Sequence, residues 1–470
     1  MTSFSAFTDD ALGTDDVVGL LRRLSSRDVS PSELTAASIA RARRADEHLG
    51  AIVAERFDAA QREADVHPGG AFGGIPTLIK DMIDVAGLPT RFGSDAFPKA
   101  APAAENDPFA QQLVDLGLTV IAKTTMPEFG FTPSTEFPDD PPTRNPWNLD
   151  RSAGGSSGGS AAMVAAGVVP IAHAADGGGS IRIPAACCGL VGLKPSAGRL
   201  LASKNTAHQL VPIVVDGVVT RSVRDTAHHL AHAEHLYLNP KLPPIGLVDR
   251  ALERPLRIGA IDRSPSPGEL DGPVRAAFDD TVALLEGLGH RVTLIDPPVA
   301  DTFVDDFVSL YQLFGAASAR AGSKVWGPAF ERRLLSEFTE GLGAAFGRRW
   351  HRVPGIVRRL RGTRKDLAAR TAGYDVLLAP TVAQVPPLLG HLGMDLTYDV
   401  LFPRVMEWAQ FTPLDNAAGT PSISLPLAHD AATNTPVGIM FSGSYGQERT
   451  LLELALQLEA ARPWASLAGA

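Results

Sequence analysis

The chain has 470 residues with a formal net charge of −9, and 44% of them are hydrophobic while 20% are charged. These proportions are ordinary for a globular protein with a sizeable core, and the negative charge argues against a general nucleic-acid binder, because phosphate binding needs a basic surface. The longest apolar run, 161–175, contains Gly167, Pro170 and His173 and is too interrupted for a membrane span.

The termini and cysteines bear on the cellular compartment. Residues 1–10 lack a basic segment followed by a long apolar core, so we expect no signal peptide. The only cysteines, Cys187 and Cys188, are adjacent and cannot form a disulfide framework, so we expect buried free thiols. We predict a cytoplasmic protein that has neither nucleic acid nor a membrane as its partner.

The first third of the chain alternates helices and strands. Residues 16–66 are predicted to be helical, and Ser30, Pro31 and Glu33 form a capping-box pattern at one helix start. The apolar run 75–79 has strand length, which places Lys80 near the end of a buried strand. A helix over 106–116 and a strand over 118–122 follow.

Two glycine-rich serine segments lie close together in the middle of the chain. Residues 154–160 read GGSSGGS and residues 176–184 read DGGGSIRIP. The apolar stretch between them predicts a helix that stops at Gly167 and a strand that begins near 168–171. Both serine loops therefore lie at the ends of packed elements, and the alternation predicts an α/β fold with a mixed, mostly parallel central sheet covered by helices on both faces.

The second half continues the same pattern. A capped helix is predicted from 222 to 236, strands over 256–260 and 291–294 flank another helix, and 301–372 is mostly helical. Because both ends of the chain contribute to one pattern, we predict a single domain over 1–470. Its expected parts are N-terminal helices (1–66), a catalytic core (67–238), a helical insertion walling the substrate cleft (300–372), and returning strands with a final helix (373–470).

The two glycine-rich serine segments, together with Lys80, resemble the amidase signature family of serine hydrolases, which use a Ser–cisSer–Lys triad. The resemblance implies that Lys80 is the base, Ser156 the serine after a cis peptide bond, and Ser180 the acylated nucleophile. It also implies the amidase-signature fold, hydrolysis of a small-molecule amide and no cofactor. Further matching segments are 74–81, 123–124, 144–148, 189–195, 220–225, 416–421 and 436–438.

Amide hydrolysis needs a nucleophile, a base, an acid for the leaving nitrogen and donors for the oxyanion. If Lys80 is buried, it becomes neutral and can take a proton from Ser156, which takes one from Ser180. Backbone N–H groups of Gly177, Gly178 and Gly179, together with that of Ser180, are the predicted oxyanion donors. Gly177 stands where the family commonly has a bulkier residue, which would loosen the loop or widen the pocket.

Two other positions are candidates for substrate contact. Gly130 matches, by its spacing to Trp147, a family position that contacts substrate, and its glycine leaves room for a bulky acyl group. Ser157 lies beside Ser156 in the first serine loop. Ser157 also fits Gly-x-Ser-x-Gly as the nucleophile of an α/β-hydrolase, but that elbow needs a strand just before it, and 146–153 is turn-like.

Other site types are disfavoured by the sequence. The glycine loops contain no Walker lysine pattern. His228, His232 and His235 have a spacing that can chelate metal, but they adjoin a core face and no metal motif follows, so we interpret them as a solvated stripe and predict no metal site. The basic run 348–365 could dock an acidic partner or an anionic substrate tail, but a solvated helix is favoured.

Three functions remain in competition. The first is a stand-alone amidase that acts on carboxamides and also on esters, anilides or carbamates. The second is the glutaminase subunit of a tRNA-dependent amidotransferase, and the third is a non-catalytic protein that uses the glycine loops to bind an anion. The resemblance is greatest to bacterial stand-alone amidases, including those that act on cyclic or linear amide oligomers. A homodimer is left open.

Overall fold

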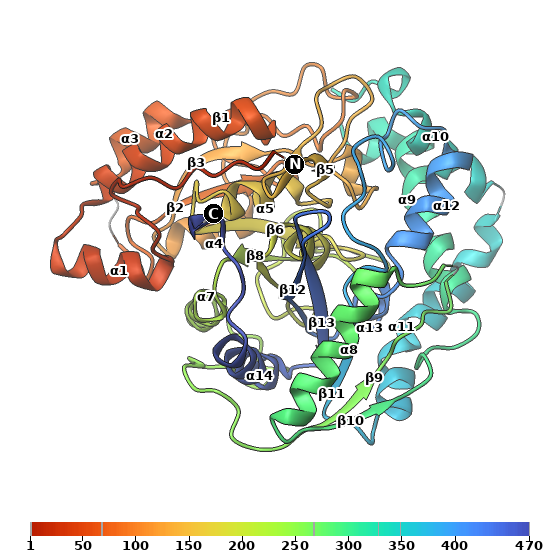
Figure 1. Cartoon of the computed structure of the whole chain (residues 1–470). Coiled ribbons are helices and arrows are strands. Elements are labelled where there is room, and N and C mark those ends of the chain that lie inside the picture. Colours follow the sequence, from red (N-terminus) through yellow and green to blue (C-terminus); the bar gives the residue numbers. More distant parts are fainter. Residues whose placement is uncertain (1, 67–68, 267, 328, 348, 470) are drawn as a thin grey trace.

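The computed structural model describes residues 2–66, 69–266, 268–327, 329–347 and 349–469. One large sheet runs through the molecule, and helices cover it on both sides (Figure 1). In spatial order its 11 strands are β1 (Ile52–Glu55), β3 (Thr119–Thr124), β2 (Pro76–Lys80), β6 (Ile171–Asp176), β8 (Val215–Thr220), β7 (Val191–Lys194), β12 (Ser422–Asp430), β13 (Thr435–Gly443), β11 (Val376–Pro380), β9 (Arg257–Ala260) and β10 (Arg291–Leu294). The predicted mixed sheet with helices on both faces is therefore confirmed.

The proportion of parallel strands is lower than predicted. Of the ten neighbouring pairs in this sheet, six are antiparallel and four are parallel. The strand–helix–strand unit that includes β6 and β7 is present, but β8 inserts between these two strands and runs antiparallel to both. Hydrophobic periodicity shows that strands and helices alternate, whereas it does not show which later strand inserts between two earlier ones.

Most helices fall in segments that were predicted to be helical, but the three that span 182–188, 398–408 and 413–418 were not predicted. They are α1 (Val17–Ser26), α2 (Pro31–Leu49), α3 (Phe57–Glu63), α4 (Pro108–Asp115), α5 (Gly158–Ala165), α6 (Arg182–Cys188), α7 (Val223–Leu236), α8 (Gly272–Gly287), α9 (Phe303–Val325), α10 (Glu337–Phe346), α11 (Val353–Arg370), α12 (Tyr398–Trp408), α13 (Pro413–Ala418) and α14 (Glu448–Ala461). The predicted capping box is present, since Ser30 Oγ accepts from Glu33 N and the Glu33 carboxylate accepts from Ser30 N. Strand β1 was not predicted, because it is a four-residue strand between two helices.

The elements that carry the serine loops lie in the centre of the molecule. Every residue of α5, β6 and α6 is buried. A helix that is apolar on all sides, as α5 is, can be stable only inside a core. Cys187 and Cys188 at the end of α6 are free and buried, as predicted, and burial raises the pKa of both thiols. They are therefore unreactive.

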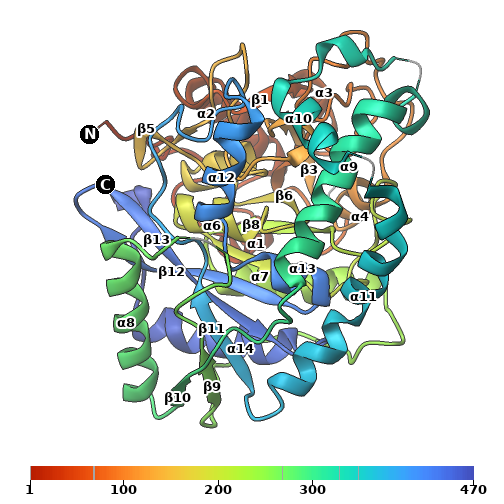
Figure 2. The same ribbon diagram turned by 90° about the vertical axis from the view of Figure 1, so that its right-hand side faces the viewer.

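The helices predicted between 301 and 372 gather with α12 on one side of the sheet (Figures 1 and 2). Helices α9 and α10 approach closely, because an added side chain at Gly315 would meet Leu342 Cβ at 2.5 Å. In the basic run, Arg348 lies outside the described residues. Arg359 pairs with Asp306, and Arg364 lies 3.6 Å from the centre of the Tyr445 ring. These arginines anchor α11 to its neighbours, but only Ile356, Leu360 and Leu367 of the helix are buried, so the predicted solvated helix is confirmed.

The histidine stripe on α7 is only partly exposed. His228 and His232 are half-buried, their rings lie 5.9 Å apart, and His232 packs edge-on against Phe72. In the part of the chain that the structure describes, no three His, Cys, Asp or Glu side chains are grouped so that they could hold a metal ion. No helix in the described ranges combines the length and apolar character that a membrane crossing needs.

Candidate active site

The neighbouring parallel strands β2 and β6 bring Lys80 and the second serine loop together. Lys80 is the last residue of β2, and Asp176 is the last residue of β6, directly before the second serine loop. The carboxyl ends of neighbouring parallel strands meet at the same edge of a sheet, where ligands commonly bind. Ser156 precedes α5, and the peptide bond between Gly155 and Ser156 is cis, as the family resemblance implied.

Lys80 and Ser156 form a hydrogen-bonded pair inside the protein. Lys80 Nζ donates to Ser156 Oγ over 2.7 Å, and the two residues are only 1% and 3% exposed. Burial lowers the pKa of Lys80 to about 7, although the nearby carboxylates of Asp176 and Asp216 favour the ammonium form. A lysine with this pKa is partly neutral at physiological pH and can accept a proton.

The backbone of Lys80 is held by a buried histidine. Lys80 N donates to His173 Nδ1 over 3.3 Å, and His173 Nε2 lies 3.2 Å from Asp216 Oδ1. Because Nδ1 accepts, the ring carries its N–H on Nε2, which is directed to Asp216. Asp216 therefore fixes the orientation of the ring that supports the lysine.

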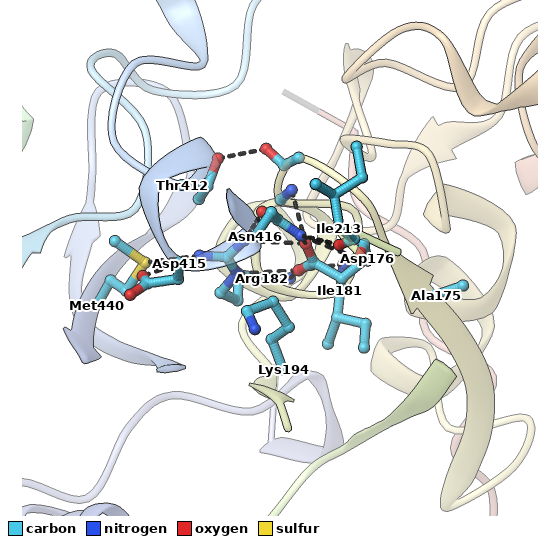
Figure 3. A network of polar contacts seen from close by, with 12 residues as sticks. Ala175, Asp176, Ile181, Arg182, Lys194, Ile213, Thr412, Asp415, Asn416 and Met440 are labelled. Atoms are coloured by element: carbon cyan, nitrogen blue, oxygen red, sulfur yellow. Dashed lines mark hydrogen bonds and ion pairs between the residues drawn. The ribbon is translucent and has the colours of Figure 1, made fainter. Parts of the chain in front are cut away.

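Asp176 organises the loop that carries Ser180 (Figure 3). Its carboxylate accepts from the N–H groups of Gly179 and Ile181, over 2.7 and 3.1 Å, and from Arg182 Nε over 2.9 Å. Burial would raise the pKa of Asp176, but the Arg182 guanidinium and these hydrogen bonds hold it well below its ordinary value. The carboxylate is therefore permanently charged and acts as the centre around which the loop folds.

Helix α13 supports this network from the opposite end of the sequence. Asn416 Oδ1 accepts from Arg182 Nη2 over 2.6 Å, and Asn416 Nδ2 donates to the backbone oxygen of Asp176 over 3.0 Å (Figure 3). Asp415 pairs with Arg182 over 3.3 Å. Asn416 was predicted only as a member of a matching segment, and Asp415 lies outside every such segment. Their positioning role was missed, and buried charges in apolar surroundings were the available signal.

The predicted oxyanion donors divide into two groups. The N–H of Gly179 is committed to Asp176, so it is not available in this structure, which corrects the prediction for that residue. Gly179 has a φ of +132°, and an added side chain would meet Thr412 Oγ1 at 2.5 Å, so glycine is needed here for backbone shape. The N–H groups of Gly177, Gly178 and Ser180 have no hydrogen-bond partner within the described residues.

Gly130 lies against the triad. Its φ is +72°, and a Cβ at this position would lie 2.9 Å from Ser156 Oγ. The absence of a side chain at Gly130 thus makes room for the Ser156 hydroxyl. The prediction was that it makes room for an acyl group. Gly130 follows Glu128, whose buried carboxylate accepts from Ser94 Oγ over 2.7 Å and from Ser336 N over 3.2 Å. Glu128 therefore ties the turn beside Ser156 to the start of α10, a link that the sequence did not reveal.

Ser157 lies outside the cavity. It is fully buried, and its hydroxyl accepts from Ala175 N over 3.3 Å, so the structure contradicts the prediction that it contacts substrate. The stretch before it is not entirely turn-like, because β5 (Asn148–Ser152) precedes it. That strand pairs with β4 (Arg144–Asn145) in a separate two-stranded sheet, so the arrangement is not an α/β-hydrolase elbow.

A cavity of about 240 Å³ joins the three members of the predicted triad. Lys80, Ser156 and Ser180 all line it, together with Gly130, Gly177 and Gly178. Ser180 is half-exposed, and its hydroxyl is not hydrogen-bonded to that of Ser156. In unliganded sites catalytic hydrogen bonds are often long and tighten only when substrate binds.

Most of the chain matches a known family, because the model described as Amidase covers residues 33–452. This chain belongs to the amidase signature family. It is 46% identical over 469 residues to the protein named "Putative amidase AmiC" of Mycobacterium leprae, with 99% of each chain covered. It is 32% identical over 464 residues to the 6-aminohexanoate-cyclic-dimer hydrolase of Pseudomonas sp. strain NK87, with 93% of each covered.

Solved structures of this family share the fold. The structure of 6-aminohexanoate cyclic dimer hydrolase complexed with substrate matches with a TM-score of 0.87 and 28% identity, over 97% of this chain and 98% of that chain. A bacterial aryl acylamidase matches with a TM-score of 0.83 and 26% identity, over 96% and 97% of the two chains. The family and fold predictions are confirmed, and this amidase is a hydrolase of amide C–N bonds.

Proposed function

We propose that this amidase hydrolyses carboxylic amides through an acyl intermediate on Ser180, with Ser156 carrying protons between Ser180 and Lys80. The observation that most supports the proposal is the hydrogen bond of 2.7 Å between Lys80 Nζ and Ser156 Oγ. Both residues are buried, and both line the same cavity as Ser180. Burial has brought the pKa of this lysine to about 7, so a neutral base is present at physiological pH.

In the first half of the reaction, Ser180 Oγ attacks the amide carbon. Its proton passes to Ser156, whose own proton passes to Lys80, and the oxyanion accepts from the free N–H groups of the 177–180 loop. When the C–N bond breaks, Ser156 gives its proton to the leaving nitrogen and regains one from Lys80. An ester of Ser180 and a free amine result.

The second half reverses the roles. A water molecule gives its proton to Ser156 as its oxygen attacks the ester, and Lys80 again becomes an ammonium. The C–O bond to Ser180 then breaks, the proton returns through Ser156 to Ser180 Oγ, and the carboxylic acid leaves. Esters, anilides and carbamates can enter the same cycle, because each presents a carbonyl carbon with a departing group.

Two alternatives are less well supported. An anion-binding protein would place a negative ligand near the charged carboxylate of Asp176, in a loop where one N–H is already taken by that carboxylate. A glutaminase subunit would bind the charged α-carboxylate and α-ammonium groups of glutamine, yet the charged side chains that line the cavity, Lys80, Arg263 and Asp415, are already paired.

Purified single chain should therefore hydrolyse simple neutral amides and anilides without a partner protein. Release of ammonia or aniline, and labelling by a serine-directed phosphonate, would be measured on the full chain. Glutamine hydrolysis that appears only with added partner subunits would favour the glutaminase. Failure of both turnover and labelling would favour a binding protein.

A further inference from the structure

We propose that the preferred substrates are neutral amides whose acyl group is aromatic or a short to medium alkyl chain, bound against helix α9 with Phe307 as the specificity-determining residue. This inference rests on the proposed acyl transfer to Ser180. It concerns the shape and charge of the cavity wall, and the proposed function would stand even if the wall had another preference.

The first support is the face that α9 presents to the cavity. Six cavity-lining side chains come from this helix at spacings of one, three or four residues, which places them on one face. They are Phe303, Val304, Phe307, Val308, Tyr311 and Phe314. The face is apolar apart from the hydroxyl of Tyr311, and that hydroxyl donates to the backbone oxygen of Phe131. A substrate portion packed here gains from burial of apolar surface.

The second support is the lack of a free charge on the cavity wall. Among the described residues that line the cavity, Lys80 is bound to Ser156, and Asp415 accepts from Ser442 Oγ over 2.8 Å. Arg263 is mostly exposed at the rim and pairs with Asp296. A charged acyl group would lose its hydration here without gaining a partner, which is strongly unfavourable.

The third support is the direction in which the acyl group must extend. The carbonyl oxygen faces the 177–180 loop, and the leaving nitrogen must face Ser156, beside Gly130, to receive a proton. The acyl substituent therefore extends along the α9 face. Phe307 stands on this face beside the serine loop, because a Cβ added at Gly178 would lie 3.8 Å from its ring. Phe131 directly follows Gly130, so it lies at the Ser156 end of the cavity, where its ring is 5.7 Å from that of Tyr311 on α9.

The cavity volume limits the size of the acyl group. About 240 Å³ is smaller than the ~300–1,000 Å³ of pockets that enclose drug-sized ligands. An aryl group or a short to medium alkyl chain fits this space, whereas a long fatty chain does not. Phe307 lies beside the 177–180 loop that carries Ser180, so its ring limits the width available to the acyl group near the attacking hydroxyl.

The test uses two series of substrates on the full chain. One series varies the acyl group of p-nitroanilides from acetyl through hexanoyl and benzoyl to dodecanoyl, and it includes glutaryl as a charged counterpart of hexanoyl. The other keeps the best acyl group and varies the amine. Wild type is compared with Phe307→Ala, with the milder Phe307→Leu, and with Phe131→Ala as a matched aromatic control at the Ser156 end of the cavity.

We expect kcat/KM to rise by about tenfold or more from acetyl to hexanoyl, since one methylene in an apolar pocket is worth ~10- to 200-fold. Glutaryl should fall about 100-fold below hexanoyl, and dodecanoyl should also be poor. Phe307→Ala should shift the optimum to bulkier acyl groups and leave the ranking of amines unchanged, whereas Phe131→Ala should change the ranking of amines. Phe307→Leu should shift the acyl optimum in the same direction.

Equal rates for glutaryl and hexanoyl, or an acyl ranking that neither Phe307 variant changes, would overturn the inference while turnover itself upholds the proposed function. Absence of turnover on every substrate, together with absence of phosphonate labelling at Ser180, would instead overturn the proposed function and the inference that rests on it.

Discussion

The pH dependence of turnover follows from the burial of Lys80. Only the neutral lysine can accept a proton from Ser156, and its pKa is about 7. Below that pH the neutral fraction falls tenfold per unit, so kcat/KM at pH 5 should be about 100-fold below its alkaline plateau. A free lysine with an ordinary pKa would instead give a rate that is still rising at pH 9.

The assay measures initial rates on a neutral anilide that does not titrate between pH 5 and 9, at substrate concentrations well below KM. Circular dichroism over the same range controls for unfolding. Lys80→Met keeps most of the length of the side chain but removes the base, so it should lose most of the rate and also the rise in rate near pH 7. A flat profile in the wild type, with chemistry limiting the rate, would refute the assignment of Lys80 as base.

Stability gives an independent check on the same pKa. Because the folded pKa of Lys80 is lowered from 10.5 to about 7, the unfolded chain binds more protons between these values, and the free energy of unfolding should rise with pH across this window. At about 1.4 kcal/mol per unit, burial of Lys80 costs several kcal/mol at neutral pH. Lys80→Met should therefore unfold at higher denaturant concentration than wild type at pH 7. Unchanged or lower stability would contradict the lowered pKa.

Three further predictions concern the surroundings of the triad. Gly130→Ala should lower kcat by about tenfold or more while circular dichroism stays unchanged, because its φ of +72° and a Cβ 2.9 Å from Ser156 Oγ displace the hydroxyl; unaltered kcat would contradict this contact. Asp216→Asn removes a carboxylate that favours the ammonium form of Lys80, so the acid limb of the pH profile should move to lower pH; a limb that stays in place would show that the charge is unimportant. Dialysis against a chelator should leave the rate unchanged, whereas loss that zinc restores would revive a metal role for the histidines of α7.

Local features of the fold were predictable from sequence because their physical causes are local. The capping box at Ser30 and Glu33 depends on four consecutive residues, and the strand ending at Lys80 depends on one apolar run. The direction of the strands around β8 was not predictable, because a strand more than 20 residues downstream inserts between β6 and β7.

The limits at the site have the same origin. The family resemblance identified Ser156 and Ser180 as candidates, and Gly179 was predicted to be an oxyanion donor. The sequence could not show that the Gly179 N–H is taken by Asp176, since that depends on a carboxylate held by Arg182 and by Asn416, which lies more than 200 residues away in the sequence. Ser156 and Ser157 are adjacent in sequence, yet the Ser156 hydroxyl accepts from Lys80 Nζ whereas the Ser157 hydroxyl accepts from Ala175 N, so the two hydroxyls have different surroundings.

The two serines have unequal roles in the proposed mechanism, because Ser180 carries the acyl group and Ser156 carries the proton. Intact-protein mass spectrometry with peptide mapping, after brief reaction with an activated ester, tests this difference most directly. The adduct should map to Ser180 in wild type, vanish in Ser180→Ala, and form slowly at Ser180 in Ser156→Ala, with the loss of rate larger for an amide than for the ester because only the amide nitrogen must be protonated. Lys80→Ala should also lose more rate on the amide than on the ester. The double variant Lys80→Ala/Ser156→Ala should lose much less rate than the two single losses combined. An adduct on Ser156 or Ser157 in the wild type would contradict the proposed mechanism.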